Sequence, residues 1–222
     1  MKIKKLTLYS NKIEQQKEFY SGLFGLSMSN NSVNSFEINI GKSWLEFKYR
    51  PNSTPYHYAI NISSNQYKDA LQWLKQRVEL LKDGQNEIID FPNWNAKAIY
   101  FYDKDKNIVE FISRKNLNIN FTKPFTSNSL LEISEIGVPS TDIELQFKIL
   151  KKCNLKIYDG NFDKFCAVGD EHGLFILINN ERKTWFPPGD KAFSSEFQIS
   201  FIEKEKYYDL EYYNEVFNQE LK

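Results

Sequence analysis

The sequence is poor in the residues that build most cysteine-based and nucleotide-based sites. Its 222 residues include two cysteines, Cys153 and Cys166, which form no CxxC pair. This spacing excludes a cysteine zinc site and a disulfide framework, and both thiols are expected in the core. GxGxxG and GxxxxGK[ST] phosphate loops are missing, as is a Gly-x-Ser-x-Gly elbow. Nucleotide binding of those types and serine hydrolysis therefore have no support.

An excess of charge and long apolar runs are also lacking. Lys plus Arg and Asp plus Glu number 29 each, so the formal net charge is zero. That balance gives no reason to expect a nucleic acid or an anionic membrane as partner. The first apolar run contains two charges, unlike a signal peptide, and no later run is long enough to cross a bilayer. We expect a cytoplasmic protein.

Aromatic residues are plentiful, at 16% of the chain, and they lie in a recurring pattern of strand, helix and hairpin. The pattern covers residues 1–50 and again 56–114. A polar stretch follows, and the pattern restarts at residue 131. A fourth start at residues 195–201 is followed by an expected helix over 207–219, where the pattern breaks off. The repeat predicts an α+β fold.

Alternation along the predicted strands separates an apolar face from a face with ionisable and aromatic side chains. An apolar face is expected against helices. If the sheet is flat, the other face is exposed to water, and if it curls, that face becomes a small-molecule pocket. Curling is favoured, because four large rings exposed to water would form an apolar patch. That face carries Lys5, Tyr9, Trp44, Glu46, His57, Tyr100, Tyr102 and Glu110.

Three motifs in residues 3–114 resemble the vicinal oxygen chelate superfamily, which includes glyoxalase I, bleomycin-resistance proteins and type I extradiol dioxygenases. They are Phe19-Tyr20 followed by Gly25-Leu26, His57-Tyr58-Ala59, and DKDKNIVEF with Glu110. The resemblance implies paired βαβββ units forming curled mixed sheets, here with an incomplete second pair. It divides the chain into a pocket domain (1–115), a linker (116–129) and a degenerate, C-terminally incomplete domain (130–222).

The resemblance also implies a set of metal ligands. The four ligand positions of the lyase-type members fall on Lys5, Glu46, His57 and Glu110. The last three suit Zn, Ni, Mn or Fe, but a protonated lysine has no lone pair to offer. Dioxygenase chemistry is disfavoured, because the first-strand histidine of those members is missing. The corresponding positions of the second half are Glu135 and Glu196, and we expect no metal there.

Two functions follow from the resemblance. The first is a lyase- or isomerase-like enzyme with a weakened metal site, in which Glu46 or Glu110 moves a proton and Lys5 stabilises negative charge. The second is a metal-free binding protein of the bleomycin-resistance type, in which Lys5 pairs with the glutamates. In both, the side chains that contact the ligand are Tyr9, Trp44, Tyr100 and Tyr102. An assembly module with a vestigial pocket is a third, weaker alternative, and a homodimer stays open.

Two further features keep alternative interpretations. The TWFPPGDKA stretch, residues 184–192, is either a lid or a packing loop, and Trp185 is expected to anchor it or to stack on a ligand or on the N-terminal pair of units. His172 lies in a predicted hairpin turn, where a polar residue is expected, and it receives no role.

Overall fold

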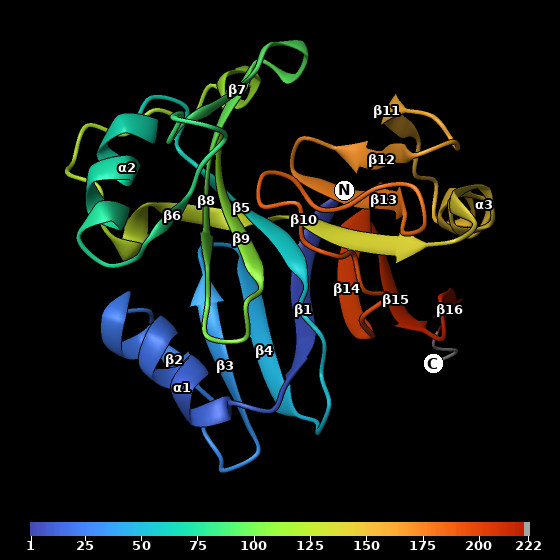
Figure 1. The fold of residues 1–222 in the computed structure, drawn as a ribbon, viewed down its shortest axis with the longest axis horizontal. Helices are drawn as coiled ribbons and strands as arrows, with labels where there is room; N and C mark the ends of the chain where they lie inside the picture. Colours follow the sequence, from blue (N-terminus) through green and yellow to red (C-terminus); the bar gives the residue numbers. More distant parts are fainter. Residues whose placement is uncertain (220–222) are drawn as a thin grey trace.

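Two mixed β-sheets carry the fold in the computed structural model, which describes residues 1–219 (Figure 1). The last three residues of the expected second domain lie outside this part of the chain. The four predicted repeats are all present as starting strands, and each sheet combines two of them. Among residues 1–219, no helix is long and apolar enough to span a membrane.

The first unit begins with the predicted alternating strand. Leu6 and Leu8 of β1 are fully buried, whereas Lys5 on the opposite face is partly exposed. The predicted helix is shorter than expected and widens into a π-helical turn, η1, before Gly25 at φ +70° ends it. The elements of this unit are β1 (Lys2–Ser10), α1 (Ile13–Lys17), η1 (Glu18–Leu23), β2 (Met28–Ser29), β3 (Ser35–Ile40) and β4 (Ser43–Tyr49).

The second unit repeats this order, and its first strand is buried along its whole length. Its helix turns Ala70, Leu71 and Leu74 inward, as the spacing predicts. The elements are β5 (His57–Ile62), α2 (Tyr67–Lys75), β6 (Leu80–Leu81), β7 (Ile89–Phe91), η2 (Pro92–Trp94), β8 (Ala96–Tyr102), β9 (Ile108–Arg114) and η3 (Lys115–Leu117).

The third unit also has the predicted strand, helix and hairpin. Asp142 caps its helix by accepting a hydrogen bond from the Leu145 backbone N–H. Cys153 and Cys166 are buried, as expected. The elements are η4 (Ser127–Ser129), β10 (Leu130–Ser140), α3 (Ile143–Lys152), β11 (Ile157–Gly160), β12 (Phe165–Asp170) and β13 (Gly173–Asn179).

The fourth unit contradicts the predicted helix over residues 207–219. This segment forms two strands that extend β14 (Phe197–Glu203), namely β15 (Lys206–Tyr213) and β16 (Val216–Gln219). Leu210 and Tyr212 alternate inward, which is a two-residue period, and aromatic residues favour strands. Positive φ at both Asn214 and Glu215 makes the tight turn between the strands.

Strand pairing crosses the expected division of the chain. Sheet A has the order β16-β15-β14-β1-β4-β3-β2 and joins the first unit to the fourth. Sheet B has the order β11-β12-β13-β10-β5-β9-β8-β6, with β7 beside β8, and joins the second unit to the third. At each junction two first strands pair antiparallel, β1 with β14 and β5 with β10. Each hollow is therefore built from both halves of the sequence, rather than from residues 1–114 alone.

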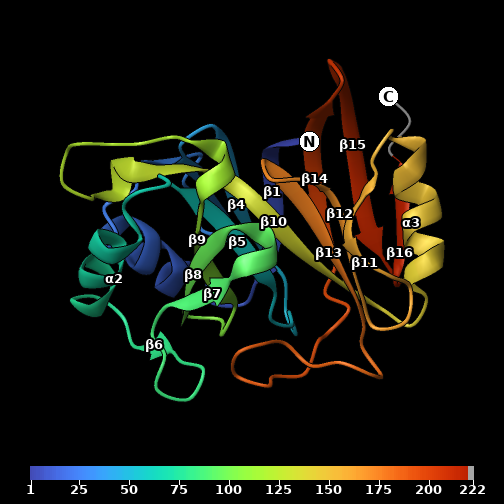
Figure 2. The ribbon, with the colours of Figure 1, turned by 90° about the horizontal axis from the view of Figure 1, so that it is seen from above.

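The apolar faces of the two sheets share one core. Phe19 of η1 in the first unit packs on Phe101 of β8, and Tyr20 hydrogen-bonds Tyr58 of β5 and Asp103. A second, smaller core lies on the other face of sheet B, around Tyr100, Ile112 and Trp185. Figure 2 shows β5, β9 and β10 side by side in the middle of the molecule. Sheet B is thus covered on both faces, which buries any polar group on its three central strands.

Candidate functional site

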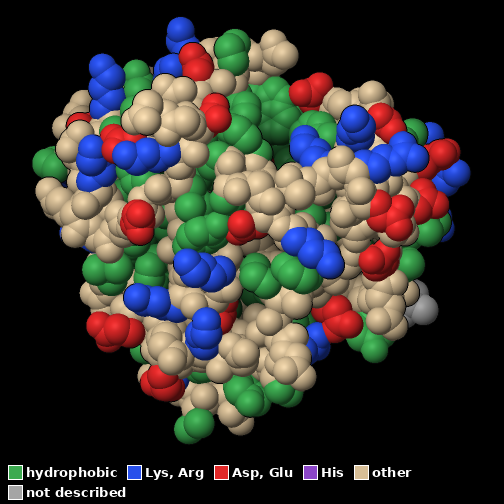
Figure 3. All heavy atoms as spheres, in the orientation of Figure 1, with side chains coloured by type: hydrophobic (Ala, Val, Ile, Leu, Met, Phe, Trp, Pro, Cys, Tyr) green, Lys and Arg blue, Asp and Glu red, His purple; other side chains and the backbone are tan. Residues whose placement is uncertain are grey.

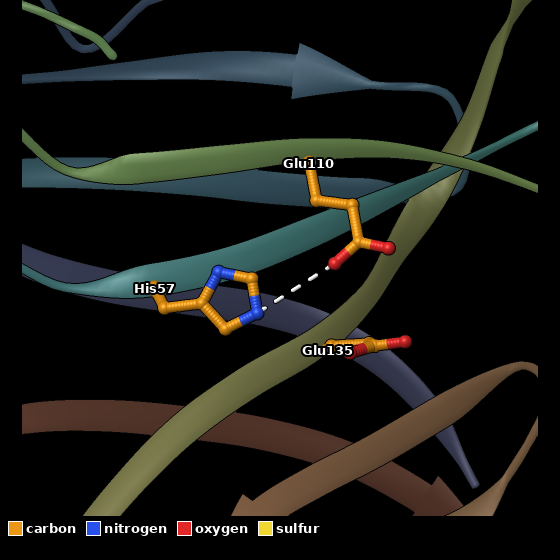
Figure 4. A group of neighbouring side chains, drawn as sticks. All are labelled: His57, Glu110 and Glu135. Carbon is orange, nitrogen blue, oxygen red and sulfur yellow. Dashed lines mark ion pairs between the residues drawn. The ribbon is translucent and has the colours of Figure 1, made fainter. Parts of the chain in front are cut away.

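Three buried ionisable side chains converge on the face of sheet B that carries the smaller core around Tyr100 and Trp185. His57 opens β5, Glu110 lies on β9 and Glu135 lies on β10, the two neighbours of β5. One ligand atom from each residue lies within 4.8 Å of the others. Figure 4 shows the three side chains pointing toward one another, and the Nε2 atom of His57 is 3.6 Å from an Oε2 atom of Glu110. The register of three adjacent strands therefore builds one compact donor set.

His57 is held as a neutral ligand would be. Its Nδ1 atom lies 3.1 Å from the backbone oxygen of Ile108, and Trp185 packs on its ring at 4.9 Å. Burial lowers the pKa of His57 to about 4, although the bond to Ile108 opposes this. A neutral imidazole that donates from Nδ1 keeps its lone pair on Nε2, the nitrogen that faces Glu110.

The two carboxyl groups lie where their charge is unfavourable. Burial, and then repulsion from Glu135, raise the pKa of Glu110 well above its usual range. Burial also raises the pKa of Glu135, and the Arg114 guanidinium opposes that rise. The Oε1 atom of Glu110 is buried and has no hydrogen-bond partner within the described chain. Two close, desolvated carboxyl groups are what a bound divalent cation would stabilise.

The donor set therefore fits a divalent metal. One imidazole nitrogen and two carboxylates are usable by Mn, Fe, Ni and Zn, and the carboxylate majority suits the harder ions best. Three protein ligands also leave coordination positions for a substrate.

Arg114 is the counterion that the protein itself supplies to this cluster. It lies on the same face of β9 as Glu110, it is fully buried, and it pairs with Glu135. Its Cζ atom lies 5.3 Å from the ring centre of Trp94. Its Nε and Nη1 atoms are buried and without partners in residues 1–219. A single guanidinium thus offsets part, but not all, of the buried negative charge.

An aromatic cavity of about 560 Å³ opens beside the cluster. All three cluster residues line it. Residues of β7 and of β12 lie on its two sides, and Figure 3 shows a hollow with hydrophobic side chains in that part of the molecule. Its aromatic walls are formed by Phe91, Trp94, Tyr100, Phe165, Trp185 and Phe186. A mainly apolar cavity with a few polar groups at one end is typical of small-molecule sites.

The TWFPPGDKA stretch closes one side of this cavity. Trp185 packs on His57, while Phe186 makes edge contacts with Tyr100 and Phe91. The Tyr102 hydroxyl donates to Oδ2 of Asp190 at 2.6 Å and ties the stretch to β8. Trp185 thus packs on the N-terminal pair of units at a tilted angle of 54°, and its backbone bridges Asp190 within the loop.

Lys5 and Glu46 do not join this cluster, because they lie on sheet A. The ammonium of Lys5 pairs with Glu37 and lies 3.1 Å from Glu46, and Thr7 donates to Glu46 at 2.8 Å. Burial lowers the pKa of Lys5, but the hydrogen bonds that its ammonium donates to Glu37 and Glu46 outweigh this and raise the pKa, so Lys5 stays an ammonium. This second hollow, of about 190 Å³, is also lined by Lys48. The expected set of Lys5, Glu46, His57 and Glu110 is thus divided between two sheets.

The four aromatic residues expected at the ligand are also divided. Tyr100 lines the cavity of sheet B, as Glu110 does. Tyr102 is not part of the cavity wall, but its hydrogen bond to Asp190 holds the 184–192 stretch against β8. Tyr9 instead stacks under Arg50 on sheet A, with 3.3 Å between the guanidinium carbon and the ring centre. Trp44, also on sheet A, is 40% exposed.

Glu135 is the main residue that the sequence reasoning missed. It was placed at a first-strand ligand position, but no metal was expected there because the second half supplies no further ligands. The available signal was an expected strand, LEISEIGV, in which two glutamates, Glu132 and Glu135, lie between apolar residues. Of its predicted counterparts, Glu196 pairs with Arg50 on sheet A. His172 lies 2.7 Å from Glu132, outside the cluster.

Sequence comparison finds relatives among curated proteins. No protein-family model matches the sequence. Metallothiol transferase FosB of Staphylococcus haemolyticus is 32% identical over 116 residues, which are 49% of this chain and 80% of that protein. The Staphylococcus epidermidis protein of the same name is 31% identical over the same length.

Solved structures share the fold over a larger part of the chain. A Bacillus subtilis protein matches with a TM-score of 0.57 at 14% identity, covering 80% of this chain, and this chain spans 63% of that protein. Glyoxalase I from Zea mays matches with a TM-score of 0.54 at 15% identity, covering 79% of this chain and 66% of the enzyme. With the curled sheets and the FosB relatives, these matches lead to one conclusion: the chain belongs to the vicinal oxygen chelate superfamily.

Proposed function

We propose that this protein is a metal-dependent enzyme that acts on a small molecule in the cavity of sheet B. The observation that carries the proposal is the donor set of His57, Glu110 and Glu135, within 4.8 Å of one another at the wall of an aromatic cavity. The relatives support it, since one is named a metallothiol transferase and a structural neighbour is glyoxalase I.

The reaction class that we favour is lyase- or isomerase-like, with group transfer as the nearest variant. A divalent ion held by the three residues would polarise oxygen atoms of the substrate. Glu110 would take a proton from the substrate, a role supported by its Oε1 atom, which has no partner within the described residues. Tyr100 beside it keeps its proton, because burial and then the charge of Glu110 raise its pKa, and its hydroxyl can donate.

The surrounding residues would exclude water and orient the substrate. Trp185 and Phe186 cover the cluster and the Tyr100 ring from one side. The opposing walls are apolar, so flat substrate groups gain burial there. The roles first assigned to Lys5 and Glu46 do not extend to this cavity, because those residues serve sheet A.

A metal-free binding protein is the second candidate function, and the Arg114–Glu135 pair favours it. A buried guanidinium already neutralises one carboxylate of the cluster. In that case Arg114 would do what was first expected of Lys5, and the cavity would bind its ligand through aromatic contact.

Metal content separates the two functions. We expect protein purified without chelator to contain close to one equivalent of a transition metal, most readily Mn²⁺, by elemental analysis. Glu110→Ala should lose it, and Glu46→Ala on sheet A should retain it. Protein that stays metal-free after incubation with Mn²⁺, Fe²⁺, Ni²⁺ and Zn²⁺ would leave the binding protein as the better description.

A further inference from the structure

The charged side chains that line the cavity of sheet B are not equally available to a ligand. Apart from the metal cluster they are Asp90, Asp159 and Lys183. Asp90 lies 3.1 Å from the ammonium of Lys97. Asp159 accepts hydrogen bonds from Trp94 Nε1 at 2.6 Å and from the Gly160 backbone N–H at 2.7 Å. Both wall carboxylates are therefore already engaged by the protein.

Lys183 is different, because its ammonium is engaged by no carboxylate in residues 1–219. Its Nζ atom lies 4.6 Å from the ring centre of Phe165, which is itself part of the cavity wall. Partial burial lowers the pKa of Lys183, starting from the ordinary lysine value well above neutral pH. A cation over an aromatic ring, without a counterion, is a ready partner for an anion.

Its position in the chain connects Lys183 to the metal cluster. It lies two residues before Trp185, which packs on His57, and three before Phe186. The same stretch therefore brings a cation, the cover of the cluster and an aromatic wall to a single cavity. A molecule seated between those walls would have one end at the cluster and another group within reach of this stretch.

We propose that Lys183 determines substrate specificity by binding a carboxylate, and that the substrate is an aromatic or similarly flat carboxylic acid. This inference rests on the proposed function for the orientation of the substrate, but not for the anion preference itself. The aromatic walls bind the body of the molecule, Lys183 binds its carboxylate, and its remaining polar atoms face His57, Glu110 and Glu135.

Three probes of equal shape and different charge test the proposal: 2-naphthoate, 2-naphthalenemethanol and 2-naphthylmethylamine. Dissociation constants are measured by calorimetry on the full chain. We expect naphthoate to bind about tenfold more tightly than the alcohol, a difference of roughly 1.4 kcal/mol in binding free energy. The amine should bind most weakly.

Variants separate charge from shape. Lys183→Met should remove the preference for naphthoate, and Lys183→Arg should keep it. Lys191→Met is the matched control, since Lys191 also lies over an aromatic ring, Phe193, but not in this cavity. The proposal is overturned if naphthoate binds no better than the alcohol, if none of the probes binds, or if Lys183→Met keeps the preference.

Metal binding is measured on the same samples, so that the two proposals fail separately. Lys183→Met should bind Mn²⁺ like the parent protein. An anion preference without metal binding would refute the enzyme and leave the role of Lys183 standing, whereas metal binding without an anion preference would do the reverse.

Discussion

The hollows of sheets A and B are built from the same kind of unit, but their charges are arranged in opposite ways. On sheet A, lysines meet the carboxylates directly: Lys5 contacts Glu37 and Glu46, and Lys48 lies 3.4 Å from Glu46. On sheet B, Glu110 and Glu135 are buried, with one guanidinium beside Glu135 and a neutral imidazole. A hollow that neutralises itself has no use for an added cation, whereas one with uncompensated buried charge does.

The largest expected effect breaks the buried pair of sheet B. Arg114→Gln leaves Glu135 buried without a counterion, which should lower the free energy of unfolding of the metal-free protein by about 3–5 kcal/mol. The stabilisation gained on adding Mn²⁺ should then be larger than in the parent. Urea denaturation with and without metal measures both quantities.

The matched change on sheet A is Lys5→Gln, which removes an ammonium that is 35% exposed. This change should lower the free energy of unfolding by about 1 kcal/mol or less, because solvent screens partly exposed ion pairs. If Arg114→Gln and Lys5→Gln lowered the free energy of unfolding equally, the charges of sheet B would be no more buried or less compensated than those of sheet A.

A pH effect is expected where the two sheets meet. Burial raises the pKa of Asp103 to about 6, from an ordinary value of 3.8, although hydrogen bonds from Asn107 and Tyr20 oppose this. The unfolded carboxyl ionises first as pH rises, so this group stabilises the fold fully below about pH 4 and loses that contribution through pH 6. The loss is up to about 3 kcal/mol.

Denaturation from pH 4 to 7 measures this contribution as the difference between the parent and Asp103→Asn. The variant should show a smaller fall in stability over that range. Asp69→Asn, at an exposed position of α2 and not among the groups that act on the Asp103 carboxyl, serves as control. If Asp103→Asn followed the parent curve at every pH, the assignment to Asp103 would be incorrect.

Metal affinity should separate the two hollows residue by residue. Glu135→Gln removes a carboxylate ligand while keeping the shape of the side chain. It should weaken Mn²⁺ binding by about 100-fold, which is the upper end of the loss seen when residues that support metal ligands are changed. Glu46→Gln should leave the affinity unchanged, because Glu46 lies on sheet A. Calorimetric titration of both variants decides between Glu135 and Glu46 as ligand, and the reverse order would restore the set first expected from the sequence.

A smaller effect on metal affinity concerns the ring of Trp185 that covers His57. A Cβ atom added at Gly137 would lie 2.6 Å from two ring atoms of Trp185, so Gly137→Ala must displace that ring. We expect about a tenfold loss of metal affinity through the freed imidazole. A Trp185→Phe change in the Gly137→Ala background should relieve the clash and recover part of the affinity. Unchanged affinity in Gly137→Ala would show that Trp185 does not position His57.

The sequence predicted most of the local structure, because short-range periods reflect which face of an element is buried. Leu6 and Leu8, and the helix from Tyr67 to Lys75, follow their patterns. The helix predicted from Tyr207 onward is wrong. Its tyrosines recur at spacings that fit both a helical and a strand period, and pairing with β14 selects the strand. His57 and Glu110 were correctly placed on one face, as they lie on neighbouring strands of a single unit.

By itself, the sequence determined the kind of unit and the faces of its strands, since these depend on residues close along the chain. It also put His57 and Glu110 on one face, because both strands belong to the second unit. Tertiary structure alone decided which units share a sheet. That choice depends on the antiparallel pairing of β5 with β10, where Ile60 meets Ile133, and of β1 with β14, where Leu6 meets Ile199. It brought Glu135 and Trp185 to His57 and left Lys5 and Glu46 to neutralise each other elsewhere. Strand order fixes such neighbours, and no local period records it.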